Sequence, residues 1–227
     1  MSFVTSMVLS AFAGLGRGSV QAYEGDAFPE TQGWARVGTL DAQRSLEDGW
    51  FVHFVGDAGQ LDAYQQSLSG FAGEQAFFIE WRMETNAPSS LLDSSATPVV
   101  LSASGGGPSL YHFTITDQRA QLLRDTNIPL VFANIVAGIP HSYRLELFGD
   151  QLYSWYVDGV LIDAGIPESA YPAGDSRLIW GTRHFVDTTT RWDYIRFGTI
   201  PEPATALLLL FGGVLLFLRR DGSHSVS

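Results

Sequence analysis

The 227-residue chain contains no cysteine, and all 13 of its basic residues are arginine. The absence of cysteine excludes disulfide bonds and thiolate chemistry, so the stability of the fold must come from core packing. The absence of lysine excludes a phosphate-binding P-loop at the glycine-rich stretch Gly105-Gly106-Gly107-Pro108, where we predict a flexible loop between two strands. The central histidines show no metal-ligand spacing and no nucleophile motif, and we interpret each as a strand-face or loop residue: His53, His112, His141 and His184.

Positive charge is scarce as well. The net charge is −11, and residues 23–200 carry 10 arginines against 22 acidic residues, a net charge of −12. Such a surface repels polyanions, which argues against nucleic acid and anionic membrane surfaces as partners. The length of this central part suits one domain with one sizeable core.

The central part also lacks a convincing amphipathic helix and an internal repeat of fixed period. Short runs rich in β-branched and aromatic residues recur instead, between turn signals such as Gly149-Asp150 and Asp158-Gly159. Residues 57–74 are rich in Gly, Gln, Ser and Asp, and we expect a long surface loop or an irregular connection there. The pattern predicts an all-β antiparallel sandwich. The expected strands are 50–55, 76–84, 98–102, 110–116, 118–123, 129–134, 142–148, 152–157, 160–163, 178–181 and 192–197.

The C-terminal end differs in character from the rest. Pro201-Glu202-Pro203 precedes an uncharged apolar run over residues 204–218, which Arg219 and Arg220 follow. We predict a transmembrane helix over 204–218, with the arginines at its cytoplasmic end. A helix of this length rises roughly 22 Å, less than the roughly 30 Å of a bilayer core, so the arginines would snorkel. The alternative is a terminal helix buried in a soluble core.

The order of these three features resembles the PEP-CTERM sorting signal of Gram-negative bacteria. The resemblance covers residues 201–220, and it implies that a membrane peptidase, exosortase, processes the chain. It assigns 200–227 as a sorting segment and makes the tail a transient tether to the inner membrane. The protein is then expected at the cell surface or in the extracellular matrix. The motif residues are Pro201, Glu202, Pro203, Arg219 and Arg220.

The N-terminal end points to the same export route. Residues 3–15 are mostly apolar, and Val20-Gln21-Ala22 has small or aliphatic residues where a signal peptidase cleaves, so we predict a signal peptide over 1–22 with cleavage after Ala22. The segment departs from ordinary signal peptides because no positive charge precedes the apolar run. An upstream start codon and a buried N-terminal helix are the alternatives.

A second resemblance concerns the stretch from His141 to Gly198. Its successive segments 143–146, 153–159 and 192–194 resemble concanavalin A-like (laminin-G-like) jelly rolls, in which a strand, a Val-Asp-Gly hairpin and a strand returning to the domain's start recur. The resemblance implies that residues 23–199 form a jelly-roll β-sandwich. Strand alternation places Tyr153, Trp155 and Val157 on one face and Ser154 and Tyr156 on the other.

Some members of that fold are glycosidases with paired carboxylates on one strand. Alternation places Glu80 and Glu84 on one face, but Arg82 stands between them where the glycosidase pattern has an aspartate. An arginine there favours the ionised form of both carboxylates, whereas a general acid must hold a proton. We therefore predict a solvated face with ion pairs and no catalytic residue, with a glycoside hydrolase as the less favoured alternative.

Carbohydrate binding, for example of an exopolysaccharide, is the favoured function. Sugar sites use exposed aromatic faces beside polar side chains, and the chain has six tryptophans and eight tyrosines. For each tryptophan a core position is the alternative, and for the whole protein a structural envelope role without a ligand. The candidate binding residues are Trp34, Trp180, Trp192 and Tyr156, with Asp158, Arg183 and Asp193 near them in sequence.

No cofactor is expected. Calcium is the one metal that the second resemblance suggests, because some laminin-G-like domains bind it. Candidate ligands exist, but no Asp-rich loop of the required spacing supports them. These candidates are Asp158, Asp163, Asp187 and Asp193.

Overall fold

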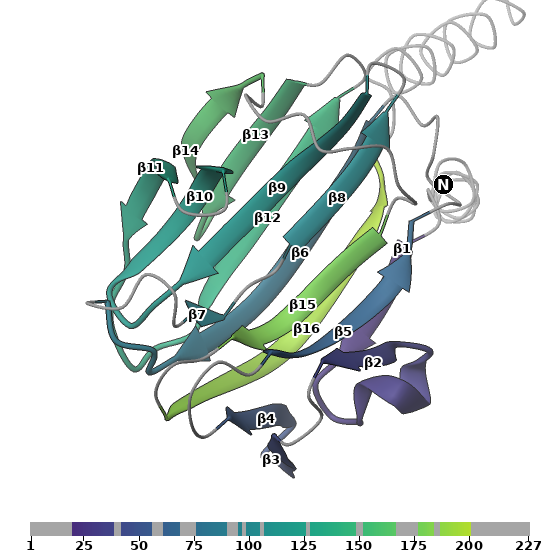
Figure 1. Ribbon diagram of the computed structural model, residues 1–227, viewed down its shortest axis with the longest axis vertical. Helices are drawn as coiled ribbons and strands as arrows, with labels where there is room; N and C mark the ends of the chain where they lie inside the picture. Colours follow the sequence, from purple (N-terminus) through teal and green to yellow (C-terminus); the bar gives the residue numbers. More distant parts are fainter. Residues whose placement is uncertain are drawn as a thin grey trace, which may run out of the picture.

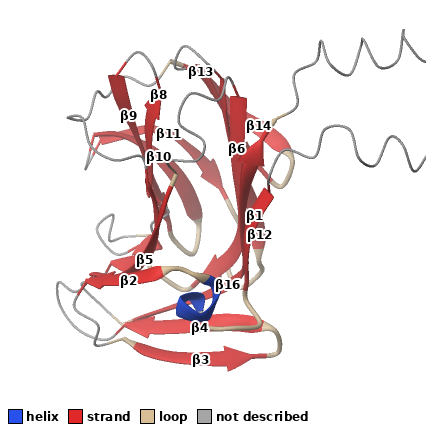
Figure 2. Ribbon diagram, turned by 90° about the vertical axis from the view of Figure 1, so that its right-hand side faces the viewer, coloured by secondary structure: helices blue, strands red, loops and turns tan. Residues whose placement is uncertain are grey.

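In the computed structural model of the chain, the described residues form two antiparallel β-sheets packed face to face (Figures 1 and 2). The structure describes residues 20–38, 42–55, 61–68, 76–89, 95–96, 99–104, 107–125, 128–148, 152–166, 177–183 and 187–200. Within these ranges the structure confirms the predicted all-β antiparallel sandwich. The expected signal segment up to residue 19 and the expected helix 204–218 lie outside the described residues.

The first sheet, here called sheet A, has the strand order β14–β13–β12–β6–β16–β4–β3, and β1 pairs with β16 beside this path. Its strands are β1 (Val20–Glu24), β3 (Gln43–Glu47), β4 (Trp50–Val55), β6 (Ala76–Thr85), β12 (His141–Phe148), β13 (Leu152–Val157), β14 (Val160–Gly165) and β16 (Thr188–Thr199).

The second sheet, here called sheet B, has the order β11–β10–β9–β7–β15–β5–β2, and β8 pairs with β15 and β9. Figure 2 shows the two layers from the side, with a short 3₁₀ helix (Pro29–Gln32) at one end. The strands of sheet B are β2 (Ala35–Gly38), β5 (Leu61–Ser67), β7 (Ser95–Ala96), β8 (Val99–Ser104), β9 (Gly107–Ile115), β10 (Arg119–Asp125), β11 (Ile128–Asn134) and β15 (Arg177–Arg183).

Alternation along β6 and β13 decides which side chains enter the core. In β6 every second residue is buried, beginning with Phe77, and Glu80 and Glu84 lie on the opposite, partly exposed face, as predicted. In β13 Trp155 is buried and Tyr156 points outward, which also confirms the prediction. This alternation gives sheet A one dry face toward sheet B and one polar face toward solvent.

The Asp158-Gly159 turn joins β13 to β14. Val157 pairs with Val160, and both turn residues have positive φ, 50° at Asp158 and 75° at Gly159. Two positive φ angles are what a two-residue type I′ hairpin requires. The predicted hairpin is confirmed.

The prediction of a loop over residues 57–74 is wrong in part, because β5 lies there. Tyr64 of β5 is fully buried, as an ordinary core residue would be, but Asp62 is buried too. A charged residue at an interior position breaks the apolar alternation by which a strand is recognised. β5 pairs with β15 over seven residues, from Leu61 opposite Arg183 to Ser67 opposite Arg177.

The first and last described strands lie side by side, because β1 pairs with β16. Val20, Gln21 and Ala22 pair with Gly198, Phe197 and Arg196, so the predicted cleavage after Ala22 would leave only Tyr23 and Glu24 of this strand. None of the helical segments in the described ranges is long and apolar enough to cross a membrane.

Candidate functional site

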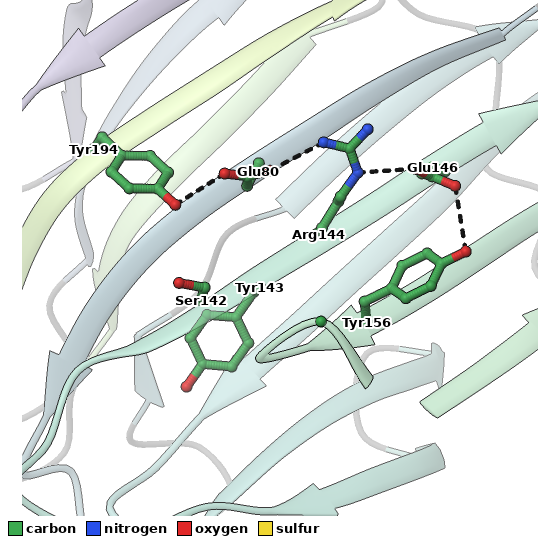
Figure 3. Close-up of a pocket in the computed structure, with 8 residues that line it drawn as sticks. Glu80, Ser142, Tyr143, Arg144, Glu146, Tyr156 and Tyr194 are labelled. Carbon is green, nitrogen blue, oxygen red and sulfur yellow. Dashed lines mark hydrogen bonds and ion pairs between the residues drawn. The ribbon is translucent and has the colours of Figure 1, made fainter. Parts of the chain in front are cut away.

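A hollow of about 390 Å³ opens on the outer face of sheet A, over β6, β12, β13 and β16 (Figure 3). Most of its polar side chains come from outward positions next to buried neighbours such as Ile79, Leu145 or Trp155, whereas Tyr143 is itself buried. The lining residues are Glu80, Ser142, Tyr143, Arg144, Glu146, Tyr156, Gly159 and Tyr194.

Five of these side chains form one hydrogen-bonded row across four strands (Figure 3), and we call them the polar row: Tyr194, Glu80, Arg144, Glu146 and Tyr156. Tyr194 donates its hydroxyl to Glu80 Oε1 at 2.8 Å. Arg144 donates to Glu80 Oε2 at 3.0 Å and to Glu146 Oε1 at 2.8 Å. Tyr156 donates to Glu146 Oε2 at 3.3 Å. The guanidinium of Arg144 therefore lies between two carboxylates, and each carboxylate accepts a hydrogen bond from one tyrosine. These hydrogen bonds hold both tyrosine rings in place.

Arg144 and Tyr194 keep their charge states around neutral pH. Burial on its own lowers the pKa of Arg144, but hydrogen bonds and attraction from Glu146 and Glu80 outweigh it and raise that pKa above the usual arginine value. Burial, followed by the bond to Glu80, raises the pKa of Tyr194. Arg144 therefore stays cationic and Tyr194 keeps its donor proton.

A β-bulge in β16 turns Tyr194 toward the hollow. Trp192 pairs with Met83 and Tyr194 with Arg82, so Asp193 is the extra residue between them. Trp192 and Ile195 both point into the core, which leaves Asp193 and Tyr194 as two successive residues on the outer face. Bulges re-aim side chains in this way.

Three of the predicted binding residues lie in the core. The expectation of exposed rings is wrong for Trp34, Trp180 and Trp192, which are 2%, 0% and 0% exposed. Trp180 and Trp192 lie between the two sheets with ring centres 4.8 Å apart. A core position was the alternative for each tryptophan, and these three tryptophans occupy it.

The other predicted binding residues lie at different places in the structure. Tyr156 lines the hollow, and Asp193 lies on the same outer face, paired with Arg82 at 2.7 Å. Asp158 holds the hairpin instead, because it accepts hydrogen bonds from the backbone N–H of Ser142 and from His141. Arg183 belongs to β15, a strand of the opposite sheet B. The predicted set is therefore not brought together.

Most of the polar row was not among the residues predicted from the sequence. Arg144 and Glu146 alternate with the buried Tyr143 and Leu145, so the period-two pattern alone could have placed them on one face. Nothing in the sequence marks the bulge that brings Tyr194 to that face. The half-buried Trp50 was also missed.

The calcium candidates do not meet. Tyr153 donates its hydroxyl to Asp163, whereas Asp158 and Asp193 have the partners given above. In the described part of the chain no group of three or more His, Asp or Glu residues is arranged to hold a metal ion.

Comparisons with known proteins support the fold rather than a family. No family model matches the sequence, and no curated protein matches it. The carbohydrate recognition domain of Emp46p in its metal-free form superposes with a TM-score of 0.56 at 10% identity, over 82% of this chain and 99% of that one. A prokaryotic beta-1,3-1,4-glucanase (lichenase) from a mouse hindgut metagenome gives 0.52 at 11% identity, over 80% and 100%.

A sialidase gives a TM-score of 0.53 at 13% identity over 75% of this chain, but only 17% of the sialidase takes part. These identities are too low to transfer an activity. What they share with this protein is the arrangement of strands. The chain has a concanavalin A-like, lectin-type jelly-roll fold.

Proposed function

We propose that the outer face of sheet A binds carbohydrate, and that the polar row is the centre of the site. The observation that carries the proposal is the row itself. Inside the hollow, an arginine lies between two glutamates from neighbouring strands, and each glutamate accepts a hydrogen bond from one tyrosine. The carbohydrate recognition domain and the glucanase among the fold neighbours support the same ligand class.

The chemistry of the row suits sugars. A sugar ring presents hydroxyls, which both donate and accept hydrogen bonds, next to apolar C–H faces. A carboxylate has about four acceptor positions and a guanidinium five N–H donors, and the bonds within the row use only part of this capacity. The amphipathic tyrosine rings supply apolar surface beside these groups.

Replacing the two tyrosines tests the proposal. We expect full-length protein to bind glycans on an array, and Tyr156→Ala with Tyr194→Ala to weaken binding roughly tenfold or more, since truncated aromatic anchors cost at least 1–2 kcal/mol. The measurement is titration calorimetry with the glycan that gives the strongest array signal.

Phe132→Ala is the matched control. Phe132 is an exposed aromatic residue with an arginine, Arg119, 5.2 Å from its ring centre, but it lies on β11 of sheet B. Binding should be unchanged in this variant. Array binding by no glycan, or equal losses in both variants, would contradict the proposal.

Binding without catalysis is part of the proposal. Glu80 and Glu146 both accept hydrogen bonds from Arg144, an arrangement that suits fixed acceptors better than a proton-donating acid. We expect no new reducing ends when the protein is incubated with β-glucan. Release of reducing ends that disappears in Glu80→Gln would favour the glycoside hydrolase instead.

We also propose that the protein is exported and sorted by exosortase, so that the glycan is met at the cell surface or in the matrix. This part rests on the Pro201–Pro203 motif, the apolar run 204–218 and the arginines after it. Mass spectrometry of the mature protein should find a C-terminus near Pro203. Mature protein that retains Arg219 and Arg220 would contradict processing.

A further inference from the structure

We infer that the site extends to Trp50, and that it takes an extended, uncharged glycan rather than a single sugar or an acidic polysaccharide. This inference rests on the proposed function and adds the length and charge of the ligand to it. It depends on a residue that lies outside the hollow.

Trp50 is the one tryptophan of the six that is not buried. The other five are at most 2% exposed, and all six fall in the described ranges. Trp50 begins β4, directly before the fully buried Phe51, so alternation places its indole on the outer face of sheet A. A large aromatic ring at this position leaves apolar surface open to solvent, and core packing does not require this surface.

Two arginines fix the indole in place. The guanidinium carbon of Arg82 lies 5.5 Å from the centre of the Trp50 ring, and that of Arg191 lies 5.3 Å from it. Each arginine has a carboxylate partner, Asp193 for Arg82 and Glu84 for Arg191. An anchored ring loses little conformational entropy when a ligand packs on it, which favours binding.

The indole and the hollow are continuous across the sheet. Arg82, which contacts Trp50, pairs in register with two residues that line the hollow, Tyr194 on β16 and Ser142 on β12. Tyr156 on β13 and Trp50 on β4 are four strand steps apart in sheet A. At about 4.8 Å per step this is about 19 Å, so one sugar ring cannot reach both, whereas a chain of several sugars can.

The charges on this face are compensated. Its ion pairs contain four arginines and five carboxylates, which leaves no described arginine here without an acidic partner and one negative charge in excess. An acidic glycan finds no unpaired cation and meets a protein of net charge −11. The pairs are Arg82–Asp193, Arg144–Glu80, Arg144–Glu146, Arg191–Glu84 and Arg196–Glu24.

The test uses full-length protein and neutral β-1,3-1,4-gluco-oligosaccharides, a disaccharide and a hexasaccharide. We expect wild type to bind the hexasaccharide roughly tenfold more tightly than the disaccharide, because only the longer chain reaches Trp50. Trp50→Ala should lose that gain and leave disaccharide binding unchanged. Phe132→Ala is again the control.

Fluorescence locates the contact independently of affinity. Because Trp50 is the only tryptophan with an exposed part, it should account for most of the acrylamide quenching, and the hexasaccharide should protect it. An oligogalacturonate of the same length, an acidic chain, should neither bind nor protect.

The outcomes separate the two proposals. Loss of binding in the Tyr156/Tyr194 variant with no effect of Trp50→Ala at either length would overturn the extension to Trp50 and leave the proposed function standing. Binding of the oligogalacturonate as tight as that of the hexasaccharide would overturn the inferred neutrality. Absence of gluco-oligosaccharide binding would overturn the inference, and absence of binding to every glycan on the array would overturn the proposed function as well.

Discussion

Trp180→Ala is expected to lower the free energy of unfolding by about 3–5 kcal/mol, the range typical of a fully buried large aromatic residue replaced by alanine. For a domain whose total stability is on the order of 5–15 kcal/mol, such a loss removes a large fraction of it. Urea unfolding followed by near-ultraviolet circular dichroism measures the change.

The size of this effect follows from the position of Trp180 at the centre of the aromatic core. The residue is on β15 of sheet B, and its ring contacts aromatic rings from both sheets. Five ring centres lie 4.8–6.0 Å away, so its removal leaves a cavity that neighbours cannot fill without losing their own contacts. These neighbours are Tyr23, Trp34, Phe51, Tyr64 and Trp192.

Trp50→Ala is the comparison for stability. Trp50 is half-buried and contacts two arginines, so its truncation should cost only about 1–2 kcal/mol. Equal losses from the two substitutions would contradict the assignment of Trp180 to the core and of Trp50 to the surface.

Acid should remove about 2 kcal/mol of stability through Asp62 alone. Burial on its own raises the pKa of Asp62, but hydrogen bonds from Arg36 and His53 and their attraction outweigh it, and bring the pKa to about 2 from a usual 3.8. The unfolded chain therefore binds a proton that the folded chain does not in this interval. The stabilisation is complete above about pH 4 and is lost as the pH falls toward 2.

A buried polar cluster between the sheets is the structural cause. Asp62 is fully buried on β5, Arg36 donates to it from Nε at 2.9 Å and also from its second nitrogen, and His53 Nε2 lies 3.3 Å away. His53 Nδ1 is hydrogen-bonded to Thr182, which is hydrogen-bonded to Thr190. Removing one charge from such a cluster leaves its partners uncompensated in a dry interior.

Asp62→Asn isolates the contribution of this carboxylate from those of the other acidic residues. At pH 7 the variant should be less stable by about 3–5 kcal/mol, since the partly buried Arg36 loses its carboxylate partner and the buried His53 loses the charge beside it. The difference between wild type and variant, measured by urea unfolding at a series of pH values, should shrink by about 2 kcal/mol between pH 4 and pH 2. A difference that does not vary with pH would contradict the lowered pKa.

The sequence predicted the architecture because most strands bury apolar residues at every second position. β6 and β13 show this clearly. The Asp158-Gly159 turn fixes the register in which β13 pairs with β14. β5 was missed because Asp62 is an interior residue that only long-range partners, Arg36 and His53, make tolerable. A pattern of neighbouring residues in the sequence cannot show that such distant partners compensate a buried charge.

The site was less predictable than the fold. Tryptophan as a residue type favours both cores and sugar sites, and the sequence offers no local sign that separates Trp180 from Trp50. What separates them is the tertiary structure, since Trp180 faces the opposite sheet and Trp50 faces solvent. Tyr194 reaches the hollow only through a bulge, whose extra residue, Asp193, has no sequence signature.

Backbone amide chemical-shift mapping by NMR, on full-length protein titrated with its best array glycan, tests the central claim most directly. The account predicts that the largest shifts fall on β6, β12, β13, β16 and the start of β4, around the polar row and Trp50. Largest shifts on the strands of sheet B, such as β9, β10 and β15, would contradict it.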